Sequence, residues 1–419
     1  MQGFRIRVAT VAMAAVVGAG YGIGTSVVAG ASTSGNKASA PGVTPTSVTV
    51  GLVTSLTGPA AANFNGAQQG AAARFALQNS KGGVNGRKLK LAVGDDGSSP
   101  LGGRTAVSEL IQTKGAFGLL FVSDLVSLGY QVAQQQGVPV VGAAIDGPEW
   151  GTKPNTNMVA VSGNQQPNLP VYNNLAKVAK QAGAKNMASL AIANEQPSIV
   201  GAQAFATSAK ALGLKVGYEN YSIPIGSVDV TSVVLGMKQA HVDGFASYML
   251  DTTNFAIMSA AKQAGLKLVA PIQFVGYDQA LLDSPTDVSA AQGAIFSVAQ
   301  VPFEEKTAAT KREQAAFVKY EHFSGVPNLN WTYGWLSADL FIKGLQAAGK
   351  NPTRTSLLNA LHKTKGWTAG GLLATAPDLS LANFGHSPSK TCGYFVKLSG
   401  TKFVPVNKGK PVCGTLVKP

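Results

Sequence analysis

Residues 48–96, VTVGLVTSLTGPAAANFNGAQQGAAARFALQNSKGGVNGRKLKLAVGDD, contain a complete strand–helix–strand pattern. A β-branched run at 48–53 is followed by a Thr-Gly-Pro loop, an alanine-rich segment and a second apolar run that ends at Asp95-Asp96. Parallel strands need a connection of a dozen or more residues, and a helix over 65–79 supplies one. The stretch therefore predicts the opening of an α/β fold with a parallel sheet.

The same alternation continues along the chain. We predict a helix at 101–113, a strand at 117–122, a helix at 125–135 capped by Ser123 and Asp124, and a strand at 138–141. After an extended segment near 158, the alternation restarts and runs to about residue 276 as a second α/β set. The remainder predicts an extended segment at 293–301, helices at 311–323, 331–347 and 353–363, and a hairpin turning at Ser399-Gly400. Two doubly wound parallel sheets are expected, with ligand crevices at the carboxyl ends of their strands.

The composition is that of a globular protein with many tight turns. The chain has 419 residues, of which 45% are hydrophobic, 13% are charged and 49 are glycine. This length is sufficient for two or three domains with substantial cores. The formal net charge is +14, but the lysines are scattered singly and no nucleic-acid motif occurs. We interpret the positive charge as a solvated surface and expect no nucleic-acid partner.

The first 31 residues have the pattern of a signal peptide. Arg5 and Arg7 precede an apolar stretch, and Ala29-Gly30-Ala31 offers small residues for cleavage. We predict cleavage, a linker at 32–46, and an exported protein that is periplasmic, extracellular or associated with the cell envelope. The competing interpretation is an uncleaved membrane anchor, which the glycines at 18–24 disfavour. No cysteine lies near the cleavage site, so a lipoprotein is not expected.

Catalytic and metal-binding patterns are not found. The four histidines are far apart in sequence and form no metal-ligand pair, and there is no G-x-S-x-G motif. Residues 344–351, GLQAAGKN, nearly match a phosphate loop but end in asparagine and terminate a helix. In an exported protein, Cys392 and Cys413 are most simply one disulfide. We expect no enzyme activity, no metal and no cofactor.

Two further groups of residues have a functional and a structural interpretation. Trp331 and Trp335 lie one helical turn apart, a spacing more typical of a buried core than of a ligand site. The pair Asp95-Asp96 would suit acid/base chemistry, but carboxylates at a strand end more often accept hydrogen bonds that order a loop.

Several motifs in one order and spacing resemble a known family. They are Leu56-Thr57-Gly58-Pro59, Phe64-Asn65-Gly66-Ala67, the run 82–89 (GGVNGRKL) and Asp95-Asp96. Together they resemble the opening of leucine/isoleucine/valine-binding proteins, the solute-binding components of ABC importers. The resemblance implies a type I periplasmic-binding-protein fold: two Rossmann-like lobes with parallel sheets, joined by three hinge crossings. Lobe 1 would comprise 47–158 and 302–368, and lobe 2 would comprise 159–301 and 369–419.

The resemblance also implies positions for ligand binding. A serine that grips the ligand's carboxylate matches Ser123, with Ser127 as its nearest alternative, and a carbonyl and a threonine match Ala144 and Asp146. Two tyrosines of lobe 2 are replaced by Ser198 and Leu250, and the acidic residue that pairs with the ligand's ammonium matches Asp278. Further contacts are expected from Phe64, Tyr248 and Tyr277. Because Asp146 would repel a carboxylate, we expect a ligand with a positive charge or with several hydroxyl or amide donors. The alternative for each aspartate is a loop cap in contact with solvent.

The leading hypothesis is a non-enzymatic, monomeric protein that captures a small polar solute between closing lobes and delivers it to a membrane permease. A membrane-anchored sensor with the same fold and an exported enzyme with a dispersed site are the alternatives.

Overall fold

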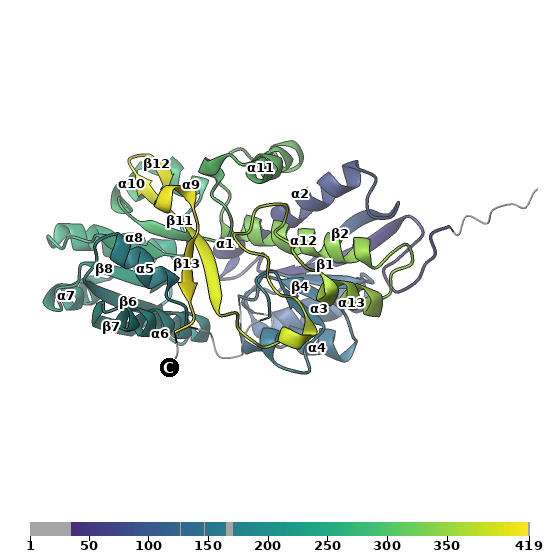
Figure 1. The fold of residues 1–419 in the computed structure, drawn as a ribbon, viewed down its shortest axis with the longest axis horizontal. Helices are drawn as coiled ribbons and strands as arrows, with labels where there is room; N and C mark the ends of the chain where they lie inside the picture. Colours follow the sequence, from purple (N-terminus) through teal and green to yellow (C-terminus); the bar gives the residue numbers. More distant parts are fainter. Residues whose placement is uncertain (1–34, 126, 146, 165–170, 418–419) are drawn as a thin grey trace, which may run out of the picture. The chain divides into compact units, whose positions relative to one another are not determined.

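The opening β–α–β prediction is confirmed by the computed structural model, which describes residues 35–125, 127–145, 147–164 and 171–417. Strands β1 (Ser47–Thr54) and β2 (Lys88–Asp95) pair in parallel, with Val48 opposite Leu89. Helix α2 (Ala67–Ser80) connects them after a short helix α1 (Ala61–Phe64). The predicted α/β class is thereby established for the first part of the chain (Figure 1).

The first sheet has five parallel strands in the order β2-β1-β3-β4-β5. The remaining elements of this part are α3 (Pro100–Gln112), β3 (Gly118–Phe121), α4 (Gly129–Gln135), β4 (Val140–Gly142), η1 (Pro148–Gly151) and β5 (Met158–Ala160). The predicted start of α4 at residue 125 was wrong. The Ser123 hydroxyl accepts the N–H of Leu125 and orders a turn, and the helix begins only at Gly129.

The second sheet is larger and mixed. Its order is β12-β11-β10-β9-β8-β6-β7, and β13 pairs with β11. Strands β6 to β10 are parallel, whereas β11 runs antiparallel to β10 and to β12. The elements are α5 (Asn174–Gln181), β6 (Asn186–Ile192), α6 (Gln196–Ala211), β7 (Lys215–Ile223), α7 (Thr231–Gln239), β8 (Gly244–Tyr248), α8 (Asp251–Gln263), β9 (Ala270–Gln273), α9 (Gln279–Asp283), α10 (Pro285–Ala290) and β10 (Ile295–Val298).

The chain passes between the two sheets three times, as expected. The first passage follows β5, and the second follows β10 through η2 (Phe303–Glu305) to α11 (Ala308–Glu321) and α12 (Leu329–Ala347), which both pack on α2. The third follows α13 (Arg354–Lys363) and η3 (Leu381–Asn383) and leads to β11 (Lys390–Ser399). One continuous chain thus forms two lobes, the first around a parallel sheet and the second around a sheet with a parallel core and antiparallel C-terminal strands.

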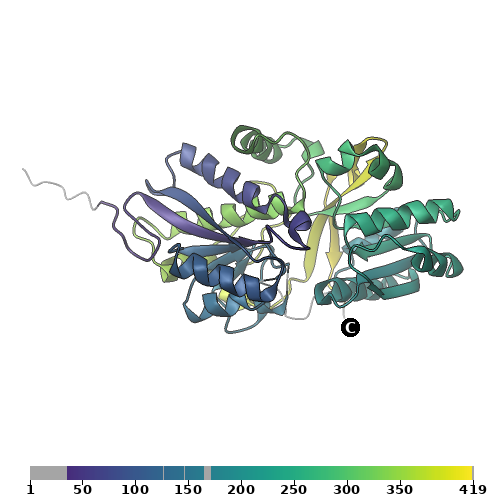
Figure 2. The same ribbon diagram turned by 180° about the vertical axis from the view of Figure 1, so that it is seen from behind.

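Each sheet has an apolar cluster on both faces. Helices α2 and α12 lie side by side over one face of the first sheet, and α3 lies over the other, in front of the strands in Figure 2. Glycines allow the close approach of α2 and α12, since a Cβ at Gly70 would lie 2.0 Å from the carbonyl oxygen of Trp331. Trp331 and Trp335 are both buried in this cluster. Their spacing therefore marks a core helix, as the structural interpretation predicted.

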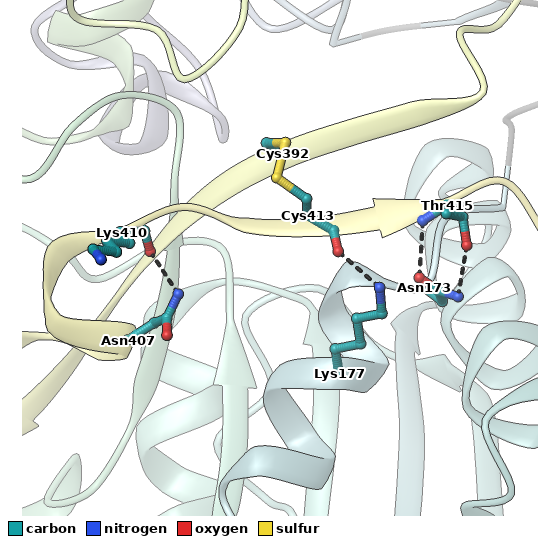
Figure 3. Close-up of a disulfide and its surroundings, with 7 residues drawn as sticks. All are labelled: Asn173, Lys177, Cys392, Asn407, Lys410, Cys413 and Thr415. Atoms are coloured by element: carbon teal, nitrogen blue, oxygen red, sulfur yellow. Dashed lines mark hydrogen bonds between the residues drawn. A yellow bond between two sulfur atoms is a disulfide. The ribbon is translucent and has the colours of Figure 1, made fainter.

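The C-terminal hairpin and its disulfide agree with the prediction. Strand β11 turns at Ser399-Gly400 into β12 (Lys402–Pro405), and after η4 (Val406–Gly409) the chain returns as β13 (Val412–Thr415). Cys392 and Cys413 are paired across β11 and β13 and form the disulfide drawn in Figure 3. The Lys177 ammonium of α5 donates to the carbonyl of Cys413 at 2.9 Å, which ties β13 to the lobe 2 helices.

Residues from the predicted linker are hydrogen-bonded to the first sheet's lobe. The guanidinium of Arg87 is 1% exposed and has no carboxylate partner among the described residues. It donates instead to the carbonyls of Lys37, Thr44 and Lys350, which joins the chain before β1 to the loop after α12. Within the described residues, no helix has both the length and the apolar character needed to cross a membrane.

Four of the scattered lysines occupy favourable helix positions. Lys180, Lys210, Lys238 and Lys262 each lie in the last turn of a lobe 2 helix. The unpaired carbonyls at a helix C-terminus carry partial negative charge, which a nearby ammonium stabilises. These lysines therefore stabilise the C-terminal ends of the helices.

Candidate functional site

A carboxylate and two serines meet at the carboxyl end of the first sheet. Asp96, which is fully buried, accepts the hydroxyls of Ser55 at 2.7 Å and Ser123 at 2.6 Å. These residues follow β2, β1 and β3, which are neighbours in the sheet. Ser123 has a single hydroxyl proton, and it donates that proton to Asp96. In this arrangement Ser123 offers no O–H donor to a ligand carboxylate.

Asp95 and Asp96 are loop-ordering acceptors, as the structural interpretation predicted. Asp95 accepts the backbone N–H groups of Leu56, Thr57 and Gly97 and the Thr57 hydroxyl at 2.6 Å. These donors lower the pKa of the Asp95 carboxyl, although burial acts in the opposite direction. The pair fixes the Thr-Gly-Pro loop against the end of β2.

A second group of carboxylates lies next to this network. The pKa of Asp124 is raised to about 6, chiefly by burial and also by the charges of Glu195 and Asp96. One carboxylate oxygen of Asp124 is buried and has no hydrogen-bond partner among the described residues. Burial also raises the pKa of Glu195, which precedes α6 in the second lobe. The two lobes therefore bring carboxylates together at this position.

In the second lobe, hydrogen bonds of Ser198 join the ends of two neighbouring strands, one of which ends at Tyr248. The buried Ser198 hydroxyl accepts the N–H of Ile192 at 2.9 Å and donates to the Tyr248 carbonyl at 2.5 Å. The Tyr248 ring stacks on Phe274, with centroids 4.3 Å apart, and burial raises the pKa of its hydroxyl. Ser198 thus connects the ends of β6 and β8, and Tyr248 provides an aromatic wall beside β9.

Asp278 and Tyr277 follow β9. Asp278 caps α9 by accepting the N–H of Leu281 at 2.9 Å, and burial and the nearby Asp251 raise its pKa. The Tyr277 hydroxyl donates to Glu304 at 2.7 Å and accepts the N–H of Phe303 at 3.1 Å. Burial raises the pKa of both Tyr277 and Glu304. Tyr277 therefore attaches β9 to the second crossing between the lobes.

A pocket lies at the meeting point of these loops. It is lined by residues after β9 and β10, by Asp251, and by lobe 1 residues from α1 and the start of α12. Asp278 and Asp251 are on its wall, together with Gln300 and Asn330. No lysine, arginine or histidine lines it among the described residues. Its volume is 60 Å³, and each water needs roughly 10–15 Å³. The space therefore suits a small polar group.

Behind the pocket, a fully buried glutamate bonds to the second crossing. Glu313 of α11 accepts the amide N–H of Gln300 at 2.6 Å, while its other oxygen has no partner among the described residues. The pKa of Glu313 is raised to about 8, chiefly by burial and also by the charge of Asp339, whereas the Gln300 hydrogen bond and Arg312 act in the opposite direction. At neutral pH this carboxyl is accordingly protonated.

The remaining predicted positions are dispersed. Phe64 is 6% exposed and packs in the lobe 1 core, and Leu250 is the partly buried residue before α8. Ala144, after β4, has φ +54°, a left-handed conformation that is strained for a residue with a side chain. Ser127 is exposed on the loop after β3. Asp146 lies outside the described residues, as do the predicted signal peptide and cleavage site.

Other polar residues of the site were missed in the sequence. Asp124 and Glu195 could have been found from the sequence, because each follows a strand at the topological switch point of its sheet, where such folds bind ligands. Gln300 and Asn330 had none, because they lie on a crossing and a helix start that only tertiary folding brings together. No group of three or more His, Cys, Asp or Glu side chains in the described part of the chain is placed to hold a metal ion.

The fold and the cleft define a class: a two-lobed α/β protein with polar loops at the carboxyl ends of the parallel strands of both sheets. A family model described as periplasmic binding protein matches residues 47–402. The chain belongs to this periplasmic binding protein family.

Relatives and solved structures are consistent with that assignment. A leucine/isoleucine/valine-binding protein of Rhizobium johnstonii is 27% identical over 205 residues, which cover 47% of this chain and 53% of the relative. A homologous protein of Brucella melitensis is 31% identical over 107 residues, or 24% of this chain and 28% of the relative. The chain thus matches about half, or less, of the length of these relatives.

Solved structures are similar in fold over most of this chain. A branched-chain amino acid ABC transporter protein from Thermus thermophilus with bound valine has a TM-score of 0.72 at 17% identity and covers 87% of this chain and 95% of that one. A solute-binding protein from R. palustris in complex with benzoate has a TM-score of 0.69 at 18% identity, covering 89% and 98%. These two neighbours bind different solutes on the same fold.

Proposed function

We propose that this protein is an exported, monomeric substrate-binding protein that captures a small polar solute between its two lobes and delivers it to an ABC-type permease. The observation that carries the proposal is the family match over residues 47–402, joined to a polar pocket where loops of both lobes meet. The named relatives and neighbours are solute-binding proteins of this kind, which favours transport over an enzymatic or sensory role.

The proposal includes lobe boundaries and a leader. Lobe 1 would comprise 47–158 and 302–368, lobe 2 would comprise 159–301 and 369–419, and residues 1–31 would be removed on export. The strand memberships support this division for the sheets, since β1 to β5 form one sheet and β6 to β13 the other. Ala369, Leu372 and Leu379 pack with Trp335 in the lobe 1 core, so the third crossing would follow them. Closure of the two lobes about the three crossings would bury the solute.

For the ligand site, we assign contact with the solute to Asp278 on the pocket wall and to the aromatic ring of Tyr248. Ser123, Ala144, Ser198, Leu250 and Tyr277 would form the surrounding frame, and Asp146 is retained as a proposed contact. Phe64, which packs in the lobe 1 core, would support the site without touching the solute.

Thermal denaturation against a library of amino acids, amides, amines, sugars and aromatic acids tests the proposal. A ligand that binds only the folded state stabilises it by about 2.7 kcal/mol at one hundred times its Kd. One solute class should raise Tm in a concentration-dependent manner, and N-terminal sequencing of exported material should start near residue 32. If no class raises Tm, the binding function is refuted.

A further inference from the structure

Two buried side-chain amides on the pocket wall have acceptor oxygens without a partner among the described residues. Gln300 is 3% exposed and Asn330 is 8% exposed, and both line the pocket. The side-chain oxygen of each is buried without a hydrogen-bond partner among the described residues. One N–H of each amide is already used, since Gln300 donates to Glu313 and Asn330 donates to the carbonyl of Asn63. A buried polar atom without a partner is costly, so these two oxygens indicate a ligand that donates hydrogen bonds.

Two carboxylates lie on the same pocket wall as these amide oxygens. Asp278 and Asp251 line the pocket and interact electrostatically with each other, with no cation among the pocket's described residues. Two carboxylates and two free amide oxygens match a group that carries a positive charge and several N–H donors. The volume of 60 Å³ is several times the roughly 10–15 Å³ that one water needs, so the pocket accommodates an ammonium together with its adjoining methylenes. The pocket therefore suits the end group of a ligand whose remainder extends out of it.

A second acidic position lies farther along the same edge of the second sheet. Glu195 follows β6, whereas Asp278 follows β9, and β8 is the one strand between them. Neighbouring strands are roughly 4.8 Å apart, so the strand ends that carry these residues are about 10 Å apart. Across from Glu195, Asp124 has a buried oxygen without a partner among the described residues. The aromatic pair Tyr248 and Phe274 lies on the intervening strands, β8 and the end of β9.

Recognition of a carboxylate is disfavoured at this second position. Ser123 gives its only hydroxyl proton to Asp96, and Asp124 and Glu195 add negative charge beside it. An anionic group placed here would meet three carboxylates and no hydroxyl donor from Ser123. The zwitterionic amino acids and the aromatic acids bound by related folds would each place such a group in the cleft.

We propose that the solute is a linear dication, a diamine or longer polyamine without a carboxylate. One ammonium would occupy the pocket of Asp251, Asp278, Gln300 and Asn330, the other would lie between Asp124 and Glu195, and the alkyl chain would pass along Tyr248 and Phe274. Ammonium and carboxylate attract at both ends, and aromatic faces accommodate the methylene chain and the adjacent cationic charge. This inference rests on the proposed solute-binding function and specifies its ligand class.

Calorimetric titration with diaminobutane, diaminohexane and diaminooctane, with aminohexane as the monoamine and leucine as the zwitterion, tests the proposal. We expect at least one diamine to bind at least tenfold more tightly than aminohexane, with an affinity that depends on chain length. Asp278→Asn retains a side chain that can cap α9, and Glu195→Gln preserves shape. Each should weaken the best diamine at least tenfold. Glu195→Gln should leave aminohexane binding less affected, because the single ammonium of aminohexane would occupy the pocket of Asp278.

The control substitution is Asp229→Asn, an exposed carboxylate before α7, which should leave diamine affinity unchanged. If a neutral or zwitterionic solute binds and no diamine does, the dication inference is overturned while the solute-binding function stands. If no compound of any class binds, both fall. Equal affinities for diamine and monoamine would also overturn the second ammonium position.

Discussion

The buried carboxyl of Glu313 leads to a prediction that depends on the structure alone. Its ordinary pKa is 4.5, and burial raises it to about 8 in the folded protein. The folded state therefore holds a proton that the unfolded state releases between these two pH values. A group whose folded pKa is raised in this way opposes folding more strongly as pH rises. The free energy of unfolding should fall by about 1.4 kcal/mol per pH unit across this window.

The substitution Glu313→Gln replaces the protonated carboxyl with a neutral group of the same shape. The Gln300 amide can still donate to the new side-chain oxygen, as it does to Glu313. At pH 7, which is 2.5 units above the ordinary pKa, the variant should be about 3 kcal/mol more stable than the wild type, and at pH 5 only about 1 kcal/mol.

Urea denaturation of both proteins at pH 5, 6, 7 and 8 provides the assay, with the unfolding free energies compared at each pH. Glu109→Gln serves as the control, because this glutamate side chain is 53% exposed beside Lys114. It should show little change with pH. A stability difference for Glu313→Gln that is constant from pH 5 to pH 8, or a less stable variant at pH 8, would refute the reasoning.

Three further predictions concern the disulfide, the helix contact and the cleft. Replacing both Cys392 and Cys413 with serine opens a loop with a sequence separation of 21 and should lower the unfolding free energy by about 3 kcal/mol in denaturant titrations; an unchanged midpoint would contradict this. Gly70→Ala places a Cβ 2.0 Å from the Trp331 carbonyl oxygen and should cost roughly 3 kcal/mol, whereas Ser80→Ala at the exposed end of α2 should cost little in the same melts. Because the pKa of Asp124 is about 6, diamine affinity should fall several-fold between pH 7.5 and pH 5 by calorimetry; a pH-independent affinity would exclude Asp124 from the site.

The sequence predicted much of the fold because local patterns and the tertiary structure agree. The run at 48–96 has strand, helix and strand patterns in an order that only a parallel crossover satisfies, and the observed register confirms it. The start of α4 was predicted wrongly because a serine that accepts a nearby N–H can order a turn as well as begin a helix.

The site was less predictable for a physical reason. Asp278 follows β9 and Tyr248 is the last residue of β8, so strand order predicts that both lie near the cleft. In contrast, Gln300 and Asn330 are ordinary polar residues of a crossing and a helix start, and they meet only because the chain returns to lobe 1. The hydrogen bond of Ser123 could not be predicted either, since its partner Asp96 lies 27 residues away in sequence. Which hydrogen bonds a side chain has already made is a property of the folded structure.

The central claim is that a small solute binds in the cleft through Asp278. Calorimetric titration of the exported protein, with the compound that raises Tm most, tests it directly. The account predicts saturable binding of one solute per chain, lost or at least tenfold weaker in Asp278→Asn and unchanged in Asp229→Asn. Saturable binding that is identical in wild type and Asp278→Asn would contradict the assignment of the site, and no binding by any compound would contradict the function.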